Sequence, residues 1–235
     1  MSSRRGRLIL LFIRHGETQD NIDRILQGHR DTSLTKNGIH EAELLAVQLK
    51  DQTFDVIYHS PLIRILQTIE PLQRRRSIHL IPDDQLKGQC LGELEGVSYD
   101  SINMSSPRSA DNRPGVELFD DFVRRLKGVF GRIVGAEAPK VGEFDRVVGV
   151  ATHGVAITSL FKALENKPDC DGFNPKLATR GPDAYEVRWT DSDDVARLSM
   201  DPNLPISNGV LDWESISGEP FLIEYWGKKE KANTE

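Results

Sequence analysis

Long hydrophobic runs and metal-ligand spacings are both absent from this chain of 235 residues. A membrane-spanning helix needs roughly 20 consecutive apolar residues, and no stretch approaches that length. The apolar run at residues 8–13 is too short for a secretory signal and is followed by Arg and His rather than by a cleavage site, so we predict a first strand there. Because the chain has no His-x-x-x-His pair and no Cys-x-x-Cys cluster, we expect no metal and no other cofactor.

Cysteine is also scarce, and acidic residues outnumber basic ones. The only cysteines, Cys90 and Cys170, are too few for a disulfide framework. A single bridge between them stays open, but a reducing compartment is the simpler interpretation, and we expect a cytoplasmic protein. The formal net charge of −6 argues against a nucleic-acid backbone as partner and fits a small anionic substrate in a locally basic pocket. We therefore expect neither a nucleic-acid nor a membrane partner.

Strand and helix patterns alternate along most of the chain. Apolar runs at residues 8–13, 56–58, 78–81 and 146–151 are typical of buried parallel strands. Helical spacing of apolar residues marks residues 35–50, 61–72, 117–134 and 156–164. This alternation predicts a single α/β domain over residues 1–235, a three-layer α/β/α sandwich with a mostly parallel central sheet.

The last third of the chain departs from this alternation. Residues 166–208 are rich in Pro and Asp and weakly periodic, so we predict a surface insertion or lid there. Residues 209–213 and 221–226 are predicted to be strands at an edge of the sheet. The charged tail at residues 228–235 is expected to fray.

Two of the predicted strands end in the same way. Residues 10–16 read Leu-Leu-Phe-Ile-Arg-His-Gly, and residues 148–154 read Val-Gly-Val-Ala-Thr-His-Gly. Open α/β sheets bind ligands at the carboxyl edge of their strands, so His15 and His153 are expected to meet in one pocket. With Arg14 and Arg64 beside them, that pocket would suit a phosphoryl group.

The tripeptide Arg14-His15-Gly16 has the chemistry for phosphoryl transfer. A neutral imidazole can attack phosphorus and hold the phosphoryl group covalently. Gly16 would remove a side chain where the substrate comes close. Taken alone, such a tripeptide is better explained as a strand end at the surface, so the interpretation depends on the segments that follow.

Those segments occur in a fixed order: Asn21, Gln27-Gly28, residues 31–35, Gly38, residues 60–64, Gln67-Thr68, residues 92–96 and Thr152-His153-Gly154. In this order and spacing the chain closely resembles the histidine phosphatase superfamily, in its phosphoglycerate-mutase-like branch, from about residue 8 to residue 164. Each segment is a weak signal alone, and together they are specific.

The resemblance implies a role for each matched residue. His15 would become phosphohistidine, and Arg14, Arg64 and His153 would bind the phosphoryl oxygens. Further substrate contacts are expected from Gly16, Asn21, Gln27, Gly28 and Gly154. Asn21 has a plain alternative, which is to form a turn. The remaining histidines match nothing catalytic and are expected to be structural or surface residues: His29, His40, His59 and His79.

The chain departs from the family pattern where the acid is expected. The family has Leu-x-Glu before Gly-x-x-Glu-Gly, and that Glu protonates the leaving oxygen, but here Leu86-Lys87-Gly88 puts Gly88 in its place. A second departure is Gly115-Val116-Glu117, where the family often has Gly-Glu-Ser. Other carboxylates close in sequence are candidate acids, although each is better explained as a solvated loop residue: Asp83, Asp84, Glu93, Glu95 and Glu117.

These observations predict a metal-independent phosphatase that hydrolyses small phosphomonoesters through phosphohistidine on His15 and releases inorganic phosphate. A positioned acid contributes about 10²–10⁴ in rate, so its loss would affect alkyl phosphates most and aryl phosphates, acyl phosphates and phosphoanhydrides least. One alternative is a pseudophosphatase that binds phosphate as a scaffold or sensor. A phosphoglycerate-type mutase ranks lower, because returning the phosphoryl group also needs the acid.

Overall fold

The computed structural model describes residues 6–102, 110–164, 195–200, 202–212, 215 and 221–226. The strands are β1 (Leu8–Arg14), β2 (Val56–His59), β3 (Leu80–Pro82), β4 (Arg146–Thr152), β5 (Val195–Met200), β6 (Ile206–Ser207), β7 (Val210–Leu211) and β8 (Phe221–Trp226). The α-helices are α1 (Gln19–Ile22), α2 (Lys36–Gln48), α3 (Ile63–Arg75), α4 (Phe119–Glu137) and α5 (Gly154–Leu164).

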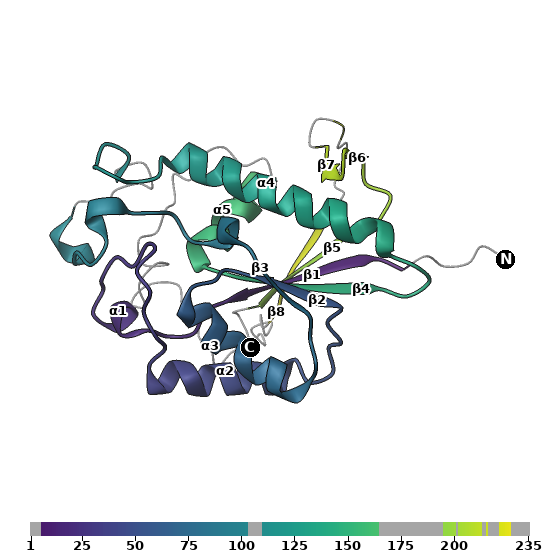
Figure 1. The fold of residues 1–235 in the computed structure, drawn as a ribbon, viewed down its shortest axis with the longest axis horizontal. Coiled ribbons are helices and arrows are strands. Elements are labelled where there is room, and N and C mark those ends of the chain that lie inside the picture. Colours follow the sequence, from purple (N-terminus) through teal and green to yellow (C-terminus); the bar gives the residue numbers. More distant parts are fainter. Residues whose placement is uncertain are drawn as a thin grey trace, which may run out of the picture.

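Six strands form the central sheet in the order β3-β2-β4-β1-β5-β8. The pairs among β1, β2, β3 and β4 are parallel, and β5 and β8 extend the sheet through antiparallel pairs. Helices α4 and α5 cover one face, and α2 and α3 cover the other (Figure 1). Every residue of β1 is buried because both faces are covered, which explains its continuous apolar sequence. The predicted three-layer sandwich with a mostly parallel sheet is confirmed.

Each face of the sheet has its own hydrophobic core. Under α4 and α5, the Phe12 ring contacts Phe130 and Phe161, with ring centroids 6.4 Å and 5.0 Å apart. The core under α2 and α3 contains Leu11 and Ile57. Burying one such side chain contributes roughly 1.5–3 kcal/mol. The two cores therefore hold the strands in place and leave the carboxyl edge of the sheet for polar residues.

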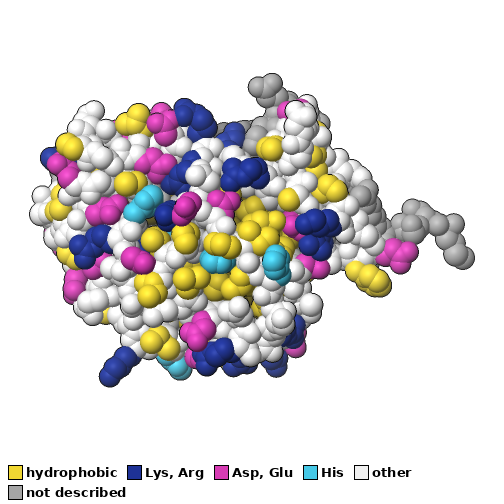
Figure 2. Space-filling model, in the orientation of Figure 1, with side chains coloured by type: hydrophobic (Ala, Val, Ile, Leu, Met, Phe, Trp, Pro, Cys, Tyr) yellow, Lys and Arg dark blue, Asp and Glu magenta, His cyan; other side chains and the backbone are white. Residues whose placement is uncertain are grey.

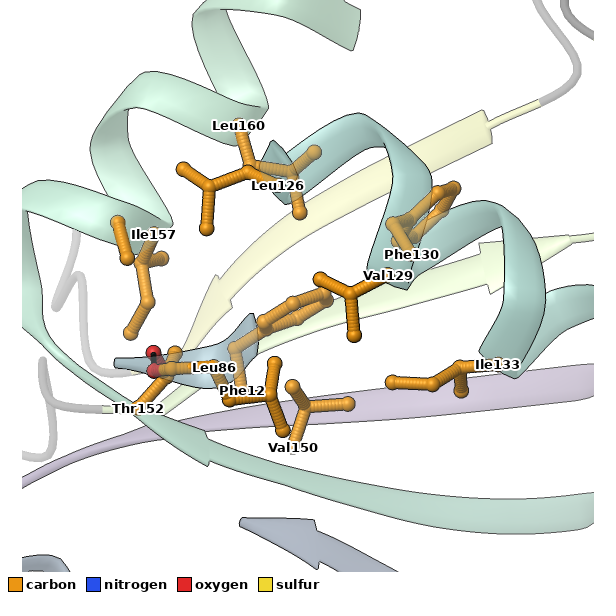
Figure 3. A pocket seen from close by; sticks show the side chains of 11 residues that line it. Phe12, Leu86, Leu126, Val129, Phe130, Ile133, Val150, Thr152, Ile157 and Leu160 are labelled. Carbon is orange, nitrogen blue, oxygen red and sulfur yellow. Dashed lines mark hydrogen bonds between the residues drawn. The ribbon is translucent and has the colours of Figure 1, made fainter. Parts of the chain in front are cut away.

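A small apolar pocket lies within the first core, between α4, α5 and the sheet (Figure 3). Its lining is hydrophobic except for Thr152, whose hydroxyl donates to the Leu86 carbonyl at 2.6 Å. This hydrogen bond joins the end of β4 to the loop that continues to Gly88. The pocket is thus part of the hydrophobic core. The hydrogen bond of Thr152 at its edge helps to position the loop that carries Gly88.

Two expectations for the last third of the chain need correction. Residues 195–200, assigned to the predicted insertion at 166–208, form β5 in the central sheet. Leu198, Ser199 and Met200 are all buried, so this strand lacks the one-sided alternation that would mark it in the sequence. Residues 210–211 pair with β6 in a separate hairpin rather than with the main sheet, whereas β8 does lie at its edge. Residues 165–194 and the tail at 228–235 lie outside the described residues.

The viewed surface mixes charges of both signs. Figure 2 shows positive and negative side chains interspersed over this face, with hydrophobic side chains gathered near its middle. The face in view therefore carries no large patch of basic side chains alone. No described helix is long and apolar enough to cross a membrane.

A buried carboxylate, Glu137, joins α4 to the amino-terminal end of β4. It is 1% exposed and accepts hydrogen bonds from Tyr58 Oη at 2.7 Å, Lys140 Nζ at 2.8 Å and Arg146 Nε at 2.6 Å. Burial raises the pKa of Glu137, but the hydrogen bonds from Lys140, Tyr58 and Arg146 outweigh it and hold this pKa below the ordinary 4.5. Glu137 therefore stabilises the fold in its charged form.

We expect Glu137→Gln to lower the free energy of unfolding by about 2 kcal/mol at neutral pH, because a neutral amide leaves the cationic partners poorly paired. The pKa of Glu137 is depressed in the folded state, so its contribution is present above pH 4.5 and is lost as the pH falls further. Urea denaturation at neutral and acidic pH measures both effects.

The matched control is Glu43→Gln, because Glu43 pairs with Arg74 on the surface with its side chain 40% exposed. This variant should change stability by less than about 0.5 kcal/mol. If the loss caused by Glu137→Gln is unchanged at acidic pH, the residue contributes through its shape rather than through its charge.

Candidate functional site

Parallel pairing of β1 with β4 brings the two His-Gly segments together. Arg14 lies opposite Thr152, so His15 and His153 follow at the same edge of the sheet. Their rings lie 5.3 Å apart between centroids and are tilted by 59°. The His15 backbone N–H donates to the Thr152 carbonyl at 3.3 Å, and both imidazoles are buried. The expected meeting of the two histidines is therefore present in the structure.

The orientation of His15 determines which of its nitrogens can react. Nδ1 lies 2.8 Å from the Gly16 carbonyl oxygen. A carbonyl can only accept a hydrogen bond, so we assign the proton to Nδ1. In the neutral imidazole the lone pair is then on Nε2.

His153 is held by a residue that sequence reasoning did not single out. Its Nε2 lies 3.1 Å from Ser60 Oγ, and the Ser60 backbone N–H donates to the Ala151 carbonyl at the end of β4. Burial lowers the pKa of His153 well below its usual range, and the positive charges of Arg64, His15, His29 and Arg125 lower it further. His153 is thus a neutral imidazole at neutral pH. Ser60 belongs to residues 60–64, one of the segments that match the family, and this match is the sequence signal that could have identified it.

Both predicted arginines are buried beside the histidines. Arg14 is 8% exposed, and a Cβ atom on Gly154 would lie 3.0 Å from its Nε. Gly154 therefore gives the guanidinium of Arg14 the room it occupies. This reason for the glycine is steric and is independent of any substrate contact.

Arg64 is 2% exposed and also holds a loop of the site. Its Nη1 donates to the Arg30 carbonyl at 2.6 Å and its Nη2 to the Gly28 carbonyl at 2.9 Å. Its Nε is buried and has no hydrogen-bond partner among the described residues. Burial lowers the pKa of Arg64 to about 10, although Asp31, Asp20 and Glu95 oppose the shift, so the group stays positive at neutral pH.

Packing gives a reason for Gly16 that is separate from the predicted close approach of the substrate, which stays a prediction. A Cβ atom there would lie 2.8 Å from the Gly38 carbonyl oxygen of α2, so the space beside Gly16 is taken by backbone. The Gly16 N–H donates to Thr68 Oγ1 at 2.9 Å, and Thr68 Oγ1 donates to the Arg64 carbonyl at 2.6 Å. Thr68 thereby connects the His15 segment to α3.

The loop residues predicted to contact substrate make internal contacts. Asn21 Oδ1 accepts from Thr18 N at 3.0 Å and from Thr18 Oγ1 at 2.8 Å. These bonds stabilise the local turn, which was the alternative to a substrate contact. Gln27 Oε1 accepts from Thr32 Oγ1 at 2.9 Å. Gly28 has a φ of +50° and lies against Glu95, which a side chain there would meet. Substrate contacts from these residues stay predictions.

Gly88 lies beside His153, at the place that the sequence comparison gives to the acid. It is buried, and a Cβ atom built on it would lie 3.5 Å from His153 Cγ, an ordinary contact distance. The Gly88 carbonyl accepts from His29 Nε2 at 2.8 Å and from Arg125 Nη2 at 3.0 Å. Residue 88 therefore borders the site without supplying a proton donor.

The five carboxylates considered as replacement acids all have other partners. Asp83 pairs with Arg132, Asp84 with Lys87, Glu93 with Arg113 and Glu117 with Arg125, while Glu95 accepts from the backbone of His29 and Leu91. The Glu117–Arg125 pair is bidentate, with both N–O distances at 2.7 Å. These contacts give each carboxylate a structural explanation.

Arg125 is a second residue that sequence reasoning missed. Its guanidinium donates to the carbonyls of Gln85, Lys87 and Gly88 and thereby fixes the loop before the site. Nothing in the helical pattern of residues 117–134 distinguishes it from the neighbouring Arg124, which pairs on the surface with Asp121. Within the described ranges, no group of His, Cys, Asp or Glu is arranged to hold a metal ion.

Comparison with known proteins gives this arrangement a family. The chain matches the model of the histidine phosphatase superfamily, branch 1, over residues 10–196. It is 28% identical over 215 residues to a 2,3-bisphosphoglycerate-dependent phosphoglycerate mutase of Cytophaga hutchinsonii, covering 86% of this chain and 99% of that protein. It is 31% identical over 163 residues to a broad-specificity phosphatase of Saccharomyces cerevisiae, covering 66% of this chain and 70% of that protein.

Solved structures agree with this result. Bacillus stearothermophilus YhfR superposes with a TM-score of 0.67 at 25% identity, covering 95% of this chain and 98% of that one. A mycobacterial glucosyl-3-phosphoglycerate phosphatase has the same fold, with a TM-score of 0.65 at 23% identity and coverage of 95% and 99%. Because the family model spans most of its length, the chain belongs to branch 1 of the histidine phosphatase superfamily.

Proposed function

We propose that the protein is a metal-independent phosphatase that hydrolyses small phosphomonoesters through a phosphohistidine on His15. The observation that carries this proposal is the hydrogen bond from His15 Nδ1 to the Gly16 carbonyl, because it leaves the Nε2 lone pair for attack on phosphorus. The buried guanidinium groups of Arg14 and Arg64 support it, since buried positive charge is costly unless an anion compensates it.

In the first step, His15 Nε2 forms a bond to phosphorus while the bond from phosphorus to the leaving oxygen breaks. The phosphoryl oxygens carry the negative charge, and Arg14, Arg64 and His153 are the groups that would stabilise it. Arg64 Nε is a buried donor with no partner among the described residues, which suits it to donate a hydrogen bond to a phosphoryl oxygen. An incoming phosphate dianion would also relieve the positive potential around His153.

In the second step, water attacks the phosphohistidine, the P–N bond breaks and inorganic phosphate is released. Because residue 88 is Gly, the first step lacks the carboxylic acid that the family places there to protonate the leaving oxygen. Aryl phosphates, acyl phosphates and phosphoanhydrides tolerate this better than alkyl esters do. The proposed substrates are therefore small phosphorylated molecules with good leaving groups, met in the cytoplasm.

A pseudophosphatase is the second candidate, and Gly88 is the observation that favours it. Such a protein would bind phosphate between Arg14, Arg64 and His153 and would act as a scaffold or sensor. A scaffold does not need a reactive Nε2 on His15, whereas a phosphatase does. The reactivity of this nitrogen therefore distinguishes the two candidates. The experiment below measures that reactivity directly.

A short pulse of ³²P-labelled aryl phosphate is expected to label the protein in the presence of EDTA. The label should be acid-labile and alkali-stable, as a phosphoramidate bond is, and should be lost on a chase with unlabelled substrate. Chelation should have no effect, because two guanidinium groups take the place a metal would fill. Inorganic phosphate, sulfate and vanadate should compete with labelling.

Two results would count against this proposal. Phosphate binding without any covalent label would favour the pseudophosphatase. Labelling that EDTA abolishes and Mg²⁺ or Zn²⁺ restores would show that a metal takes part.

A further inference from the structure

His29 contacts Gly88, the residue that stands where the family has its acid. Its Nε2 donates to the Gly88 carbonyl at 2.8 Å, although the two residues are 59 positions apart in the chain. His29 also contributes to the positive potential at His153, whose ring lies beside Gly88. It is therefore a titratable group at the edge of the site that the mechanism above does not use.

The backbone around His29 keeps it in this place. Its N–H donates to Glu95 Oε1 at 2.8 Å, and its neighbours Gly28 and Arg30 accept from Arg64. The loop is thus joined both to the segment that carries Gly88 and to a buried arginine of the site. His29 is half-buried, so proton exchange with water is open to it.

We propose that His29 donates the proton to the leaving oxygen, in place of the carboxylic acid that Gly88 lacks. The proposal rests on the proposed function, because it concerns the first step of the same reaction. A hydrogen bond to a carbonyl uses Nε2–H, so Nδ1 is the nitrogen that takes up and gives off the proton. Among the described residues, no hydrogen bond occupies Nδ1.

The step balances with His29 as its only additional participant. His15 Nε2 forms the N–P bond, the P–O bond breaks, and the leaving oxygen takes the proton from the His29 imidazolium. In the second step, neutral His29 accepts a proton from the attacking water as the P–N bond breaks. Imidazole groups titrate between about pH 5 and 8, so one residue can serve both steps.

Charged groups of both signs face His29. Asp84 and Glu95 are the nearby carboxylates. The nearby cations are Lys87, which pairs with Asp84, and Arg125, which donates to the same Gly88 carbonyl. His153 is neutral at neutral pH because its own pKa is lowered, so it adds little charge there.

The test compares one aryl phosphate with one primary alkyl phosphate across the pH range in which imidazole titrates. In wild type, the alkyl-to-aryl ratio of kcat should fall as the pH rises, because only the imidazolium can donate. In His29→Gln, this ratio should fall by about 10²-fold at acidic pH, the lower end for a positioned acid, and lose its pH dependence. Glutamine keeps an N–H donor for the Gly88 carbonyl, so the loop should stay in place.

His40→Gln is the matched control, because His40 is exposed on α2 and should leave the ratio unchanged. The proposal is overturned if His29→Gln keeps the wild-type ratio at every pH, or if only KM rises, which would identify a binding residue. Wild type without any alkyl phosphate turnover would overturn it as well. Failure of the proposed function is a separate result, in which an aryl phosphate, which needs no acid, leaves no phosphohistidine.

Discussion

Replacing His15 with Ala is expected to abolish covalent labelling and to reduce turnover by at least about 10⁴-fold. Removing a nucleophile leaves only binding and charge stabilisation, and the other groups of the site cannot form the intermediate. The fold should survive, because His15 follows a strand and its hydrogen bond from Nδ1 to the Gly16 carbonyl is worth only about 1 kcal/mol.

The measurement combines pulse labelling with steady-state turnover of an aryl phosphate, and urea denaturation checks the fold. His59→Ala is the matched control, because His59 is also buried at a strand end and its Nδ1 lies 3.0 Å from a backbone carbonyl, that of Ser60. Both variants lose an equivalent side chain, and only His59→Ala should still be phosphorylated. Turnover by His15→Ala within a few-fold of wild type would contradict the assignment of the nucleophile.

Introducing an acid by Gly88→Glu is expected to raise alkyl phosphate turnover by about 10²-fold, the lower end for a positioned acid. The backbone admits the change, because the new Cβ would lie 3.5 Å from His153 Cγ and its next neighbours are 3.7 Å away. Aryl phosphate turnover should rise far less, since an aryl oxide leaves without a proton.

Gly88→Gln is the control, because it adds the same volume and cannot release a proton. We would measure kcat for a series of esters and plot it against the pKa of the leaving group. The glutamate variant should flatten this dependence, whereas the glutamine variant should not. If wild type already cleaves alkyl and aryl esters equally well at high pH, another donor is present, and Glu93, Glu95 and Glu117 should be replaced one at a time.

The parts of the fold that the sequence predicts are those with a strong local pattern. Strands β1 and β4 are covered on both faces, so burial requires the continuous apolar runs seen at their positions. Helix α2 begins after Thr35, whose side chain accepts from the Gly38 N–H, so the helical pattern at residues 35–50 also has a local start signal. Strand β5 escaped prediction because it lacks a one-sided alternation and follows a weakly periodic segment.

Some residues of the site could likewise be predicted from a local sequence pattern, and others could not. His15 and His153 each end a recognisable strand, and the rule for the carboxyl edge of a parallel sheet is enough to place them together. Gly88 could be placed by its distance from residues 92–96. The contacts of Arg125 and His29 with the Gly88 carbonyl could not be predicted, because they join residues 37 and 59 positions apart, and both Gly88 and His29 lie in loops without periodicity.

The pairing of β1 with β4 has a consequence for the order of events during folding. These strands align Leu8 with Arg146, roughly 140 residues later, and the intervening chain must be brought into place before they can meet. During synthesis, the first strand therefore waits for its partner until most of the chain has left the ribosome. The proposed phosphate site is complete only when this long-range pairing has formed, and an anion bound there would draw the folding equilibrium of the whole molecule toward the native state.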